Sequence, residues 1–259
     1  MRMMKKVLGT VTVLALSVSL LAGCGSTAAS PVSSAASTAA ESTTSSIVPE
    51  TTSAAADENV AAAAQLLNDL TGSYQELWPV ILADKYQQTW LDDCAALVGE
   101  ENAEAAFEKL SSMVTGDVYG EDAVEAYANG GGAYFCGFTN SLATLTFDGE
   151  TSTISGTDKD GNVLFSHTYH YIGMEPVRGL YEFESDGAGS GEFTYFFLAP
   201  DTSAETYHIE FRYGSDAEAL SQYDAGEYAY WVASGISTDC DQTMIDNCIE
   251  LFCTENLAG

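Results

Sequence analysis

A run of short alternating segments between residues 133 and 214 constrains the fold most strongly. In segments such as 204–214, every second side chain is apolar, as expected of a β-strand with one buried face. Asp-Gly pairs at 148–149, 160–161 and 186–187 separate the segments, and such pairs are typical of tight hairpin turns. Consecutive strands joined by short turns favour an antiparallel meander, which loses its exposed edges when it closes into a barrel.

Helical patterns lie on both sides of these strands. Apolar residues recur there at a spacing of three or four positions, which we interpret as packing faces. The predicted helical segments are 57–70, 84–98, 101–114, 121–129, 216–223 and 239–253. The sequence therefore predicts a mainly β fold, an antiparallel β-barrel with N-terminal and C-terminal helices.

The N-terminus has the pattern of a bacterial lipoprotein signal. A basic start precedes an apolar run at 7–23, and "LAGC" at 21–24 is a lipobox. A retained membrane helix needs about 20 apolar residues, and this run is shorter. We expect residues 1–23 to be removed as a signal peptide and Cys24 to carry a lipid. The protein would then be lipid-anchored to the cell membrane, on its extracytoplasmic face, with no other membrane contact.

Residues 24–56 consist almost entirely of Ser, Thr, Ala, Pro and Glu. Such a segment buries too little apolar surface to offset its chain entropy, so we expect a disordered tether. The remaining residues, 57–259, have a suitable length for one folded domain.

The chain is strongly acidic. It has eight Lys and Arg against 38 Asp and Glu, and three of the basic residues (Arg2, Lys5 and Lys6) lie in the signal. The mature chain would keep five basic residues, so its formal charge would be −33. This charge argues against nucleic acid as a partner and is compatible with attraction of cations.

Five cysteines follow Cys24, so at least one thiol has no partner within the chain. Exported domains normally form disulfides where geometry allows. We expect one intramolecular disulfide that joins the tail, 240–253, to Cys94 or Cys136. The five cysteines are Cys94, Cys136, Cys240, Cys248 and Cys253.

Three histidines are candidate metal ligands, because neutral imidazole is the commonest protein ligand of zinc. His208 shares a strand face with Thr206 and Glu210. His167 and His170 are three residues apart, so they should point to opposite faces of their strand, His167 inward and His170 outward. By this periodicity, His167 is the better partner for His208. The simpler alternative is a strand histidine that contacts a neighbouring carboxylate.

Several ordered segments carry a family resemblance. They are "LTGSYQELWPVIL" (70–82), "YHYIG" (169–173), "RGLYEFE" (178–184), "AP" (199–200), "ETYHI" (205–209) and "YGSDAEAL" (213–220). Together they resemble the ZinT (YodA) family of zinc- and cadmium-binding proteins over roughly residues 66–255. The resemblance implies a lipocalin-like (calycin) barrel for 57–259. It also implies an extracytoplasmic lipoprotein that binds zinc or another divalent metal ion, such as cadmium, for capture or for delivery to a metal transporter.

The family's metal site contains three histidines, two of them in a His-aromatic-His pair just before an Ile. Only His208 matches this pattern, since Thr206 stands at the first position of the pair and the segment 195–200 offers Phe in place of the third histidine. The resemblance therefore implies His208 as a zinc ligand. Carboxylates could complete a mixed site. The candidates are Asp201, Glu205 and Glu210.

Two functions stay open at this point. The first is metal binding, and the second is a lipocalin-like module for a small ligand or a protein partner that has lost the metal site. Aromatic residues that lined an open barrel mouth would favour the second function. No Gly-x-Ser-x-Gly elbow and no catalytic Cys/His arrangement stands out, so we expect no enzyme.

The lipobox yields a direct prediction. Cys24→Ala should release the protein from the membrane fraction, because lipid attachment requires that thiol. Fractionation of cells followed by immunoblotting measures the distribution. Co-sedimentation of the variant with the membrane at the wild-type level would contradict the lipoprotein interpretation.

Overall fold

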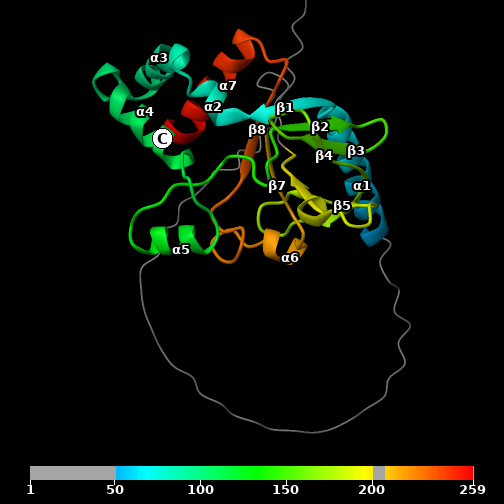
Figure 1. Cartoon of the computed structure of the whole chain (residues 1–259). Coiled ribbons are helices and arrows are strands. Elements are labelled where there is room, and N and C mark those ends of the chain that lie inside the picture. The colour runs from blue at the N-terminus through cyan, green and yellow to red at the C-terminus, as the bar shows by residue number, and fades with distance from the viewer. Residues whose placement is uncertain (1–50, 201–207, 259) are drawn as a thin grey trace, which may run out of the picture. The chain divides into compact units, whose positions relative to one another are not determined.

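The computed structural model describes residues 51–200 and 208–258, and their central feature is a closed barrel of eight strands (Figure 1). Every neighbouring pair is antiparallel, and the order around the barrel is the order along the chain. The strands are β1 (Gly72–Glu76), β2 (Thr144–Asp148), β3 (Thr153–Thr157), β4 (Val163–Met174), β5 (Tyr181–Ser185), β6 (Tyr195–Leu198), β7 (His208–Gly214) and β8 (Ala233–Ser237). This up-and-down arrangement is the architecture of lipocalins, so the predicted fold class is confirmed.

The strands differ from the prediction at both ends of the barrel sequence, because β1 and β8 lie outside the predicted range of 133–214 and the start of that range forms no strand. Residues 133–143 were expected to begin the meander, but Phe135 forms only isolated bridges, to Thr115 and Trp231. Strand β8 already pairs with β7 on one side and with β1 on the other, which leaves no free edge for this segment to join. The segment instead runs beside the chain that leads into β8, with Ser234 donating its backbone N–H to the Cys136 carbonyl.

Seven α-helices and three short 3₁₀ turns complete the described residues. The helices are α1 (Thr51–Asp69), α2 (Leu77–Ile81), α3 (Gln87–Val98), α4 (Ala103–Val114), α5 (Glu121–Ala128), α6 (Ala217–Leu220) and α7 (Gln242–Leu257). The turns are η1 (Asp84–Tyr86), η2 (Glu100–Asn102) and η3 (Gly191–Phe193). Within the described residues, no helix is both long and apolar enough to span a membrane.

Helix α1 begins at Thr51, inside the range assigned to the tether. The signal peptide, Cys24 and residues 25–50 lie outside the described residues. Apolar residues of α1, including Leu66, Leu67 and Leu70, pack into the same core as the barrel interior. The folded domain therefore uses this helix to cover part of its barrel.

Two hydrophobic cores meet at strand β8. Aromatic side chains dominate the core inside the barrel, among them Phe147, Phe165, Tyr169, Phe183, Phe196, Phe211 and Tyr213. The second core lies between the barrel and helices α2, α3, α4 and α7, which gather on one side of it (Figure 1). All five residues of β8 are buried, because Ala233 faces the first core and Ile236 the second. Its sequence ASGIS lacks the polar alternation that marks a strand with one solvated face.

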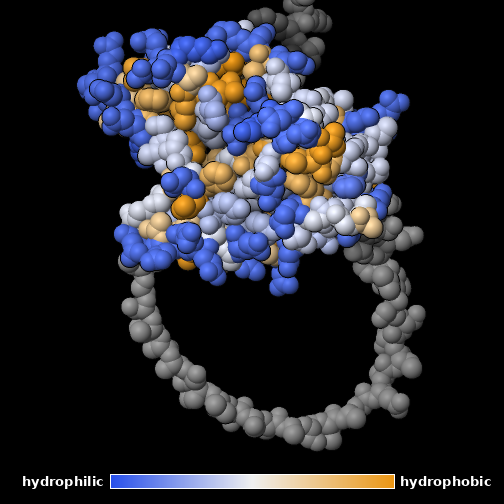
Figure 2. All heavy atoms as spheres, in the orientation of Figure 1, coloured by the Kyte–Doolittle hydropathy of each residue, from blue (hydrophilic) through white to orange (hydrophobic). Residues whose placement is uncertain are grey.

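The outer face of β4 is the least covered part of the barrel. Hydrophilic residues cover much of the visible surface, and apolar residues gather over part of the strands and also among the helices (Figure 2). Most of the large apolar side chains that are exposed among the described residues lie on β4 or in the turn after it, namely Val163, Leu164, Ile172, Met174 and Val177. Polar groups on this face are therefore open to solvent.

The cysteines lie mainly in the helical core, and no disulfide joins those that the structure describes. The Sγ atoms of Cys94 on α3 and Cys253 on α7 are 3.8 Å apart, and both side chains are fully buried. A disulfide needs about 2.05 Å between its sulfur atoms, so small side-chain rotations would suffice. Of the pairs that the sequence left open, the structure favours Cys94 with Cys253.

We therefore predict that oxidation links Cys94 to Cys253. Burial raises the pKa of both thiols, so few thiolates are present in the folded state and the bond should form before the helices pack. Reduction should lower the free energy of unfolding by about 2–4 kcal/mol. Thiol counting and denaturant unfolding with and without reductant measure both effects.

Two variants provide the control for this prediction. Cys94→Ala should remove the dependence of stability on reductant, whereas Cys240→Ala should retain it. A count of five free thiols in protein folded under oxidising conditions would contradict the predicted bond.

Candidate functional site

His208 lies on the outer face of the barrel, at the first residue of β7. Its register partner is Ile236 of β8, whose side chain belongs to the helical core. Glu210 follows on the same face opposite Ser234, whereas Ile209 and Phe211 point into the barrel. The predicted division of this strand into two faces is therefore correct. Thr206, which the resemblance placed beside His208, and the candidate carboxylates Asp201 and Glu205 lie outside the described residues.

His167 lies on the inner face of β4, as its periodicity predicted. Its ring stacks beside Phe165, with centroids 6.3 Å apart, and its side chain is half-buried. Gly187, in the turn after β5, packs directly against the imidazole, since a Cβ atom there would lie 2.5 Å from Nδ1 of His167. These contacts place the imidazole between Phe165 and the turn after β5.

His170 lies on the outer face of β4, again as predicted, and two carboxylates flank it. Its Nδ1 atom is 2.8 Å from Oδ1 of Asp186, and its Nε2 atom is 3.7 Å from Oε2 of Glu184. Glu184 is the register partner of His170 on β5, and its other oxygen accepts a hydrogen bond of 3.2 Å from Tyr195. The imidazole is about half exposed, at 52% of its side-chain surface.

The three histidines do not meet. His167 and His170 occupy opposite faces of β4, and strands β5 and β6 separate both from His208 on β7. Among residues 51–200 and 208–258, no group of three or more His, Cys, Asp and Glu side chains is arranged to hold a metal ion. His170 thus has two carboxylate neighbours, and whether any histidine binds metal stays a prediction.

The sequence analysis missed Glu184 and Asp186. Asp186 was noted only for its turn with Gly187, and Glu184 only as part of a strand. The sequence held a signal for Glu184, because β4 and β5 form a hairpin, and the register of a hairpin fixes which β5 residue lies opposite His170. That deduction requires the turn length, which residues 175–180 made ambiguous.

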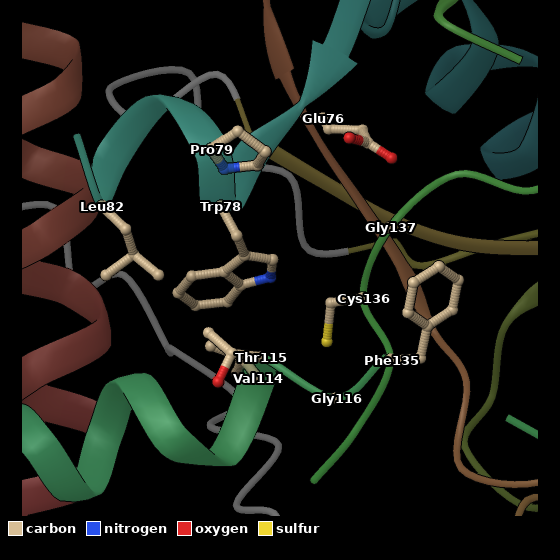
Figure 3. Close-up of a pocket in the computed structure, with 10 residues that line it drawn as sticks. All are labelled: Glu76, Trp78, Pro79, Leu82, Val114, Thr115, Gly116, Phe135, Cys136 and Gly137. Carbon is tan, nitrogen blue, oxygen red and sulfur yellow. The ribbon is translucent and has the colours of Figure 1, made fainter. Parts of the chain in front are cut away.

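A cavity of about 340 Å³ lies between α2, the end of α4 and the segment at 135–137 (Figure 3). Apolar side chains form most of its wall, including Trp78, Leu82, Val114 and Phe135. Glu76, Thr115 and Cys136 contribute its polar side chains, and Cys136 lies beside the indole of Trp78 (Figure 3). The cavity lies outside the barrel, whereas aromatic side chains fill the barrel interior. A ligand inside the barrel, as in an open lipocalin, is therefore disfavoured by packing.

No protein-family model and no curated protein matches the chain. Among solved structures, it is similar to the Zn(II)-bound ZinT-like domain of Streptococcus pneumoniae AdcA, with a TM-score of 0.45 and 15% identity. That match covers 71% of this chain and 89% of the other. It is also similar to Zn(II)-bound AdcA from Streptococcus pneumoniae, with a TM-score of 0.42, 14% identity, and coverage of 72% of this chain and 35% of that one.

The contact between His167 and Gly187 can be tested by stability. Gly187→Ala should lower the free energy of unfolding by about 1–3 kcal/mol, because the added methyl group overlaps the imidazole. In a His167→Ala background the same change should cost much less, since the ring is gone. Urea unfolding of the four proteins measures this cycle. Equal costs in both backgrounds would contradict the inward placement of His167.

Proposed function

We propose that this chain is a membrane-anchored, extracytoplasmic protein that binds a divalent metal ion, with zinc as the first candidate. The observation that carries the proposal is the position of His170 between Glu184 and Asp186. In this proposal the protein binds and releases the ion, for capture or delivery to a transporter, and catalyses no reaction. Lipidation at Cys24 would hold it at the membrane.

The distances around His170 suit zinc. Zinc bonds to imidazole nitrogen and to carboxylate oxygen are both about 2.0–2.2 Å long, so two ligands at a tetrahedral angle lie about 3.4 Å apart. Nε2 of His170 and Oε2 of Glu184 are 3.7 Å apart, which needs only a small adjustment. These two atoms are therefore the proposed ligands.

Asp186 supports the same arrangement from the other side of the ring. Its carboxylate lies 2.8 Å from Nδ1 of His170, so a proton on Nδ1 would be shared with Asp186 and Nε2 would be left as an acceptor. A carboxylate in this position fixes the tautomer and orientation of a metal-binding histidine. Tyr195 orients Glu184 in a similar way through its hydroxyl group.

Two protein ligands with open positions would make a weak and exchangeable site. Water would complete the coordination, and the exposed outer face of β4 gives the ion free access. The strong negative charge of the chain would raise the local concentration of cations. Such a site suits capture and release better than permanent storage.

Calorimetric titration of the full chain with zinc tests this proposal. We expect saturable binding to wild type, and a loss of affinity of about tenfold or more in His170→Ala, Glu184→Gln and Asp186→Asn. Because protons compete for the ligand atoms, affinity should also fall as the solution becomes more acidic.

Two histidine variants separate this site from the one that the family resemblance implies. His167→Ala and His208→Ala should leave zinc affinity unchanged if His170 is the ligand. Loss of binding in His208→Ala, with normal binding in His170→Ala, would move the site to β7 and overturn the assignment to His170. Absence of saturable zinc binding by wild type near neutral pH would reject the metal function altogether.

A further inference from the structure

The indole of Trp78 has a polar atom that the fold leaves unused. Trp78 is 8% exposed, and its Nε1 atom makes no hydrogen bond of normal geometry among the described residues. The other two tryptophans donate to backbone carbonyls, Trp90 to Ile81 at 2.8 Å and Trp231 to Gly137 at 2.9 Å. A buried donor without an acceptor costs free energy, so the unpaired N–H of Trp78 requires an explanation.

The neighbouring thiol is a poor acceptor for this N–H. Burial raises the pKa of Cys136 to about 12, and weak side-chain hydrogen bonds with Ser234 and Trp78 offset only part of that effect. The thiol is therefore neutral, and its own proton points towards the Tyr134 carbonyl, 3.9 Å away. A neutral sulfur accepts hydrogen bonds only weakly. The indole nitrogen faces the cavity beside Cys136 instead (Figure 3).

Glu76 supplies the opposite kind of group to the same cavity. Its Oε1 atom accepts the backbone N–H of Phe138 at 2.6 Å, which fixes the carboxyl group at the cavity wall. The cavity thus combines a fixed acceptor, a free indole donor and an apolar wall that includes Leu82, Val114 and Phe135. A cavity with a mainly apolar wall and a few convergent polar groups is typical of a small-molecule site.

We propose that this cavity binds a small primary amine that has an apolar body and a carbonyl oxygen next to the amine. The ammonium group would contact Glu76, and the carbonyl oxygen would accept the N–H of Trp78. The apolar body would lie against Leu82 and Val114. An anionic ligand is disfavoured, because Glu76 and the net charge of the chain would both repel it. The site shares no residue with the proposed metal site, so each proposal can fail alone.

Leucinamide is a suitable probe, since it contains all three groups. The full chain, labelled with ¹⁵N and kept in detergent, gives one indole N–H signal for each of its three tryptophans. The Trp78 signal is assigned as the one that Trp78→Phe removes. We expect leucinamide at millimolar concentration to move this signal in a saturable way and to leave the Trp90 and Trp231 signals in place.

Two related compounds test the groups of the ligand without altering the protein. Leucine carries a carboxylate in place of the amide, and 4-methylpentanamide lacks the ammonium group. Both should bind at least about tenfold more weakly than leucinamide, because a charge-assisted hydrogen bond is lost or a repulsive charge is added.

Two substitutions test the protein side. Glu76→Gln keeps an oxygen for the N–H of Phe138 but removes the charge, so affinity for leucinamide should fall about tenfold or more. Glu150→Gln, an exposed acid on a distant hairpin, should leave affinity unchanged. A Trp78 signal that stays in place at saturating probe concentration would overturn the proposal, as would equal binding of leucinamide and 4-methylpentanamide.

Discussion

The whole structure depends on strand β8, which is buried on both faces. It closes the barrel by pairing with β7 and β1, and its outer face carries Ile236 into the helical core. Small residues allow this double role, since a Cβ atom at Gly235 would lie only 3.1 Å from the side chain of Ile209. Because one five-residue strand borders both cores, a disturbance in either core reaches the other.

A buried guanidinium, that of Arg212, holds the chain between α6 and β8 against the barrel. Arg212 projects from the outer face of β7 and is fully buried, and it donates to the backbone carbonyls of Leu220, Gln222 and Tyr228. The Cζ atom of Arg212 also lies over the ring of Tyr223, 4.4 Å from the ring centroid. Burial lowers the pKa of Arg212 to about 10, so the group stays charged at neutral pH. These bonds tie the irregular chain between α6 and β8 to the barrel, where it would otherwise have few backbone partners.

The sequence predicted the middle of the barrel well and its closure poorly. Strands β2 to β7 have alternating residues and Asp-Gly turns, which are local signals. Strands β1 and β8 lack such signals, because β1 leads directly into α2 and β8 is buried on both sides. Their pairing joins residues near 74 to residues near 237, a contact that no local pattern encodes. The barrel was therefore predictable from its strands, but the strands that close it were not.

The same limit applies to the candidate sites. The inward and outward directions of His167 and His170 follow from periodicity alone, and the structure confirms both. The carboxylates beside His170 depend on hairpin register, and the unpaired N–H of Trp78 depends on how α2 docks beside the 135–137 segment. Such features arise from contacts between distant residues, so composition and spacing cannot reveal them.

The two proposed sites lie at the borders of the region of the barrel that helices and the Arg212-bound loop cover. Helices cover the outer face of β8, and the Arg212 contacts hold a loop against β7, where Glu210 is exposed. The β4–β5 face has no such cover, and there His170 and Glu184 meet solvent. At the other boundary, α2 and α4 approach the barrel without closing on it, which leaves the cavity beside Trp78. Because aromatic side chains pack the interior of the barrel, both proposals place their ligands on its outside.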